Sequence, residues 1–88
     1  MAVGYAQARP TEATVLSSLE EVVGVEATSV WDSTCERAHV LRPVGELSTL
    51  LLVAELLTAS EVSLARVAGR SIVIRIVSYK ALDEQGLL

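Results

Sequence analysis

The fold predicted from the sequence depends most on residues 70–79, Arg70-Ser-Ile-Val-Ile-Arg-Ile-Val-Ser-Tyr79. Alternate positions hold Ile72, Ile74 and Ile76, which would share one face of a strand. β-Branched side chains favour strands over helices, because their stiff χ1 angles fit a pleated surface better than a helical turn. This stretch therefore predicts a strand over 70–79.

A shorter run over 61–67 precedes it, and Ala68-Gly69 separates the two. Glycine readily adopts positive φ, which is typical of a tight hairpin turn. We therefore expect an antiparallel hairpin over 61–79. Residues 80–88 then form a short tail or a final helical turn, with Gly86 as a break.

Upstream, residues 46–58 predict the strongest helix of the chain. Helical spacing places five apolar side chains on one face: Leu47, Leu50, Leu51, Ala54 and Leu57. Leu52, Val53 and Leu56 lie largely outside that face. A helix that is apolar on most sides is buried on most sides. The sequence therefore predicts a contact with another chain through the outer side of this helix and the edge strand 61–67. The predicted interface residues are Leu52, Val53, Leu56, Val62 and Leu64.

A further helix is predicted over 11–23. Thr11 is a suitable N-cap and Gly24 a suitable stop. The partly alternating segment 25–32, which includes Trp31, predicts a strand, and Asp32-Ser33-Thr34 a turn.

A second strand is predicted over 37–42, ended by Pro43, although Glu36-Arg37-Ala38 could equally form a helical turn. The predicted order is α-β-β-α-β-β. Sequential hairpins favour an α+β, two-layer fold with a mainly antiparallel sheet and helices packed on it.

Size and composition also indicate a partner. The chain has 88 residues, of which 51% are hydrophobic, and its mean hydropathy is +0.48. A short chain has few interior positions, so some apolar surface is expected to remain outside and to mark an interface. We expect a single globular domain over 11–88 after a flexible tail over 1–10.

Charge is distributed unevenly along the chain. The net charge is −4, yet every charged residue in 63–80 is basic. These residues are Arg66, Arg70, Arg75 and Lys80. This hypothetical basic patch leaves a DNA-binding alternative open. In that alternative the C-terminal half is a winged helix-turn-helix, with helices over 47–57 and 64–68 and a recognition helix over 71–82.

No catalytic, cofactor-binding or metal-binding constellation is recognisable. Cys35 and His39 are the only cysteine and the only histidine. A nucleophilic pair would also need an orienting group and an oxyanion site, and a zinc site would need further ligands. We expect a non-enzymatic protein with no cofactor and no metal.

The compartment is predicted to be the cytoplasm. A single cysteine cannot form an intrachain disulfide, and the first ten residues lack the charge and apolar run of a secretory signal. The longest nearly continuous apolar stretch, 50–57, is too short to span a membrane.

One pattern resembles a known family. The segment Leu19-Glu-Glu-Val-Val-Gly-Val-Glu-Ala-Thr-Ser-Val-Trp-Asp32 resembles the opening of the roadblock (dynein light chain 7) family, where a Gly-Val pair follows the first helix and an Asp ends the first strand. The hairpin over 61–79 is similar to that family's third and fourth strands. The first hairpin lacks the usual glycine, having Ser33, Thr34 and Cys35 instead. The resemblance covers residues 14–79 and implies a non-enzymatic dimerising platform.

These observations together predict a protein–protein interaction or scaffolding module. It would act as a homo-oligomer or as a subunit of a larger complex, with itself or another protein as partner. The DNA-binding regulator is the alternative.

Overall fold

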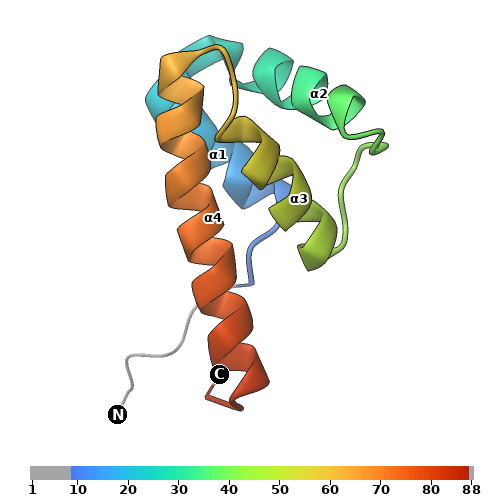
Figure 1. Ribbon diagram of the computed structural model, residues 1–88, viewed down its shortest axis with the longest axis vertical. Helices are drawn as coiled ribbons and strands as arrows, with labels where there is room; N and C mark the ends of the chain where they lie inside the picture. Colours follow the sequence, from blue (N-terminus) through green and yellow to red (C-terminus); the bar gives the residue numbers. More distant parts are fainter. Residues whose placement is uncertain (1–8, 88) are drawn as a thin grey trace.

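The computed structural model describes residues 9–87, and all the regular structure in that range is helical (Figure 1). The elements are α1 (Glu12–Val23), a 3₁₀ turn η1 (Gly24–Glu26), α2 (Ala27–Arg37), α3 (Leu47–Leu57) and α4 (Ser63–Glu84). The fold of this part of the chain is therefore all-α, and the prediction of an α+β fold is wrong.

Helix α1 begins at a reciprocal cap. The Thr11 side chain accepts a hydrogen bond from the Thr14 backbone N–H, and the Thr14 hydroxyl accepts one from the Thr11 N–H. Gly24 ends the helix with φ of +73° and donates its N–H to the Glu20 carbonyl. The predicted helix over 11–23, its N-cap and its glycine stop are confirmed.

The strand predicted over 25–32 is wrong, because these residues form η1 and the start of α2. The alternation there is short and partial. Ala27, Trp31, Thr34 and Cys35 are all buried, and their spacing of four, three and one is that of a helical stripe. Burial of this stripe against α1 and α3 outweighs the local preference of a few β-branched residues.

The strand predicted over 37–42 is also wrong. Its residues end α2 and enter the connection that leads to α3. His39 has φ of +58°, a left-handed conformation that interrupts any extended run.

The hairpin predicted over 61–79 is replaced by one long helix, α4. Five small or apolar residues recur at helical spacing and are buried, namely Ala65, Ala68, Gly69, Ile72 and Ile76. They pack against α1 and α3. The β-branched run is tolerated in a helix because intrinsic propensities are small compared with the burial of this face.

Gly69 lies in the interior of α4 and forms no turn. A Cβ atom at this position would lie 2.7 Å from Leu57 Cβ and 3.0 Å from the Thr58 backbone nitrogen. The missing side chain therefore lets α4 approach the C-terminal end of α3 closely.

The core lies between α1, α3 and α4, with α2 covering one end. Its largest fully buried side chains include Leu19, Trp31, Leu50, Leu57 and Ile76. Figure 1 shows that the C-terminal part of α4 extends beyond the other helices, at the end of the molecule opposite α2. Because the described residues contain no sheet, the likeness to the roadblock architecture and the description of a small α/β domain are wrong.

The predicted domain boundaries fall partly outside the described residues. Most of the tail predicted over 1–10 lies there, and so does Leu88. The helix predicted over 46–58 is confirmed as α3, within one residue at each end.

Candidate interaction surface

An exposed apolar surface follows the side of α4 that faces away from the core. Leu64, Val67, Ile74 and Val77 keep between 49% and 66% of their area exposed. We call this the outer surface of α4. It consists of these four residues and the exposed positions between and beside them, which are Arg70, Ser71, Ser78 and Ala81.

The placement follows from helix geometry. At about 100° per residue, Val67, Ile74 and Ala81 point to the side opposite buried Ile72 and Ile76. Six of the nine large apolar residues that are exposed in residues 9–87 lie within 62–87: Val62, Leu64, Val67, Ile74, Val77 and Leu87. The apolar excess of the sequence is therefore concentrated on and beside α4.

The interface residues predicted from sequence are separated by the structure. Val62 and Leu64 are exposed at the start of α4, and Leu52 is 48% exposed on α3. Leu56 is half-buried, and Val53 is fully buried in the core.

Helix α3 directs Leu50, Val53, Ala54 and Leu57 inward, whereas Leu47 and Leu51 are only half-buried. Since α3 is apolar on most sides, its periodicity did not determine which side faces the core. Val53 therefore does not contribute to the exposed surface of the chain.

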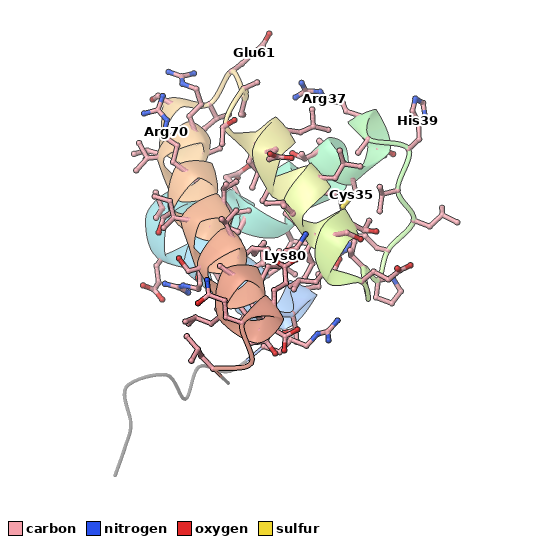
Figure 2. All side chains as sticks on the ribbon, turned by 60° about the horizontal axis from the view of Figure 1, so that its bottom comes forward. Cys35, Arg37, His39, Glu61, Arg70 and Lys80 are labelled. Carbon is pink, nitrogen blue, oxygen red and sulfur yellow. The ribbon has the colours of Figure 1, made fainter. Side chains whose placement is uncertain are left out.

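The four basic residues predicted as a patch do not share one face. Arg66 Nη1 donates to the Ser60 carbonyl at 2.7 Å, and Arg75 Nη1 donates to Ser18 Oγ of α1 at 3.0 Å. Arg66 and Arg75 point to opposite sides of α4, about 180° apart. Arg70 and Lys80 lie at separate levels along the helix (Figure 2), about 15 Å apart along its axis.

The helix-turn-helix geometry that would use such a patch is also missing from the described residues. Helix α4 continues without a break through 68–71, where the turn before a recognition helix was expected.

Cys35 and His39 do not form a reactive pair. The Cys35 side chain is 2% exposed, and burial raises the pKa of its thiol, with a further contribution from the nearby Glu12 carboxylate. His39 lies on the connection after α2, and its ring points away from the body (Figure 2). A buried, protonated thiol is a poor nucleophile.

A polar network that the sequence did not indicate joins α1, α2 and the connection before α3. Glu12 Oε2 accepts hydrogen bonds from Trp31 Nε1 at 2.8 Å and from Arg42 Nε at 2.9 Å. Arg42 also forms an ion pair with Asp32. Burial acts to raise the pKa of Glu12, but the hydrogen bonds from Arg42 and Trp31 outweigh it and lower that pKa below its usual value.

This network satisfies the indole N–H of the fully buried Trp31. Its role is structural, since it fixes the N-terminal end of α1 to α2 and to the connection between α2 and α3. No local pattern could have indicated it, because its members are separated by 19 and 30 positions along the chain.

An open cleft of about 560 Å³ lies between α2 and the connection from α3 to α4. Ser29, Ser33 and Arg37 line it from α2, and Ser60 and Glu61 line it from the connection. Figure 2 shows the labelled Arg37 and Glu61 side chains directed outward at this end of the molecule. Serine hydroxyl groups together with one basic and one acidic side chain do not indicate a particular class of ligand.

Residues 9–87 were also considered for a metal site and for a membrane-spanning helix, and they contain neither. No group of three or more His, Cys, Asp or Glu side chains there is arranged to hold a metal ion. None of the helices in this range has both the length and the apolar character that crossing a bilayer requires. Comparison with known proteins finds no matching protein-family model, no matching curated protein and no matching solved structure.

Proposed function

We propose that this chain is a non-enzymatic interaction module that acts as a homo-oligomer, with the outer surface of α4 as its contact. The observation that carries the proposal is the concentration of exposed large apolar side chains on that surface, between 49% and 66% exposed. Large exposed apolar side chains that gather on one face of a small protein typically mark a protein interface.

The composition of the surface supports a protein contact. Leu64, Val67, Ile74 and Val77 supply apolar area, and Arg70 is a residue type enriched in interfaces. Ser71, Ser78 and Ala81 are small, so a second helix can approach α4 closely. These features together are typical of helix-to-helix packing.

The outer side of α3 is a weaker choice for the contact. Its most exposed apolar residue, Leu52, lies beside exposed Ser48 and Glu55, and Val53 is buried. A single exposed leucine is common on protein surfaces and requires no partner.

A cytoplasmic location remains a prediction from the sequence.

Light scattering over a dilution series tests the proposal. The wild-type chain is expected to exceed its monomer mass of 9.4 kDa at high concentration. Ile74→Glu places a charge on the contact and should return the mass to that of the monomer. Leu52→Glu is the matched control, because it adds the same charge at an exposed apolar residue of α3, and it should leave the mass unchanged.

Either of two results would overturn the proposal. One is a wild-type chain that stays monomeric at every concentration. The other is a dimer that Leu52→Glu dissociates and Ile74→Glu does not, which would move the contact to α3. Far-UV circular dichroism of each variant establishes that its helices are intact.

A further inference from the structure

This inference rests on the proposed function and specifies its geometry. We propose that two copies of the chain pack the outer surfaces of α4 against each other in antiparallel orientation around Val77, so that Arg70 of each copy pairs with Glu84 of the other.

The spacing of three residues defines the arrangement. Arg70, Val77 and Glu84 are seven positions apart, so they lie on one line along α4, separated by about 20° of rotation per step. A two-fold axis beside Val77 reverses this line onto itself. Val77 then faces Val77 of the second copy, and each Arg70 lies opposite a Glu84.

The apolar residues agree with the same axis. Ile74 is one turn before Val77 and is the most exposed apolar residue of α4, at 66%. In the antiparallel pair, Ile74 and Val77 of both copies form one apolar centre. The Arg70–Glu84 pairs then flank that centre at both ends. An apolar centre with a charged rim is the usual organisation of a protein interface.

The charges along α4 favour this orientation over a parallel one. Its first two turns carry Arg66 and Arg70, its last turn carries Asp83 and Glu84, and Arg75 and Lys80 lie between them. A parallel pair would place like charges opposite each other, whereas an antiparallel pair places opposite charges together.

Two of the remaining cations of the helix have hydrogen-bond partners of their own. Arg66 donates to the Ser60 carbonyl, and Arg75 donates to Ser18. Half-buried Lys80 lies one helical turn before Glu84, but the two side chains form no ion pair in the structure of residues 9–87.

Free space along the helix permits a second copy. The C-terminal part of α4 extends beyond α1 and α3 (Figure 1). Arg70, in the N-terminal half of the same helix, points outward (Figure 2). The overlap from 70 to 84 covers about four helical turns, or about 22 Å, so the contact uses Ile74 and Val77 and leaves Leu64 and Val67 beyond it. A contact of this length is at the small end for protein interfaces, so we expect a reversible dimer with a dissociation constant in roughly the micromolar range.

Charge inversion tests the orientation. In the antiparallel dimer, Arg70→Glu creates two Glu–Glu contacts and Glu84→Arg creates two Arg–Arg contacts. Each single variant should therefore weaken dimerisation by about tenfold or more. The double variant Arg70→Glu/Glu84→Arg restores opposite charges and should dimerise like the wild type.

An equimolar mixture of the two single variants provides an internal control. In the antiparallel heterodimer, the introduced glutamate of one variant faces the introduced arginine of the other, and the native Glu84 of the first faces the native Arg70 of the second. Mixing should therefore restore the dimer and thereby establish that both variants are folded. Glu21→Arg, an inversion at an exposed residue of α1, should not change dimerisation. Sedimentation equilibrium or light scattering measures each of these samples beside the wild type.

The outcomes separate this inference from the proposed function. A wild-type dimer whose single variants dimerise normally, or whose double variant fails to recover, overturns the antiparallel arrangement and leaves self-association standing. A wild-type chain that is monomeric throughout overturns both.

Discussion

Replacing Gly69 with alanine tests the closest helix contact of the fold. The new Cβ would lie 2.7 Å from Leu57 Cβ and 3.1 Å from the Leu57 carbonyl carbon. Carbon atoms in ordinary contact are about 3.5–4.0 Å apart, so α3 and α4 must separate locally by about 1 Å. The obstructing atoms belong to the backbone or are attached directly to it, so a change of rotamer cannot remove the clash.

The net effect follows from two opposing contributions. Overpacking of this kind typically costs about 1–3 kcal/mol, whereas replacing glycine by alanine inside a helix gains about 0.5–1 kcal/mol. We expect Gly69→Ala to lower the free energy of unfolding by about 1–2 kcal/mol. With a urea m-value of about 1 kcal/mol/M, the midpoint should fall by roughly 1–2 M.

Urea denaturation followed by Trp31 fluorescence measures this effect, since Trp31 is the only tryptophan and is fully buried. All samples need one protein concentration, because self-association adds to the apparent stability. Gly45→Ala is the matched control, since a Cβ there has no neighbour within 4 Å, and it should leave the midpoint unchanged or raise it. An unchanged or raised midpoint for Gly69→Ala would refute the close packing of α4 on α3.

Two further predictions concern the groups around Trp31 and the buried thiol. The pKa of Glu12 is lowered from 4.5 in the folded chain, so its ionised form stabilises the fold above that pH, and the stabilisation is lost as the pH falls through the folded value. Glu12→Gln should therefore destabilise the chain by about 2 kcal/mol at pH 7 and by progressively less below pH 4.5. A difference from the wild type that does not vary with pH in urea titrations would contradict this role. Cys35 should react with a thiol reagent at least about a hundredfold more slowly in the native chain than in urea. Comparable rates in the two conditions would show that the thiol is accessible in the fold.

The first and third helices could be predicted from sequence because their signals are local. Thr11 and Gly24 mark the ends of α1 by capping chemistry, which depends on a few neighbouring residues. The leucine-rich segment that forms α3 has an apolar content and length typical of a buried helix.

The strands were predicted wrongly because two periodicities overlapped. Residues 72–77 alternate in the way a strand does, yet Ala65, Ala68, Ile72 and Ile76 also recur at spacings of three and four. Burial against two neighbouring helices decides between these interpretations, and burial depends on contacts with residues distant in the sequence. The helical spacing across Gly69, with no proline after Pro43, was the signal that could have indicated α4.

The sequence indicated that the chain has an exposed apolar surface, but it did not indicate where that surface lies. Composition indicated an exposed apolar face, which the described residues have. Its position on α4 depended on which elements are helical, and the inward orientation of Val53 depended on how α3 rotates against the core. The network around Glu12 joins residues distant in the sequence, so it became evident only in the folded chain.

Cysteine cross-linking directly tests whether two copies meet through the outer surface of α4. Val77→Cys places a thiol at the proposed two-fold axis, and the native Cys35 is buried and should not react. With a short bismaleimide, we expect rapid formation of a covalent dimer, twice 9.4 kDa in mass. The matched variant Glu21→Cys on α1 should remain monomeric. Efficient cross-linking at position 21 together with none at position 77 would show that the two copies do not meet through α4.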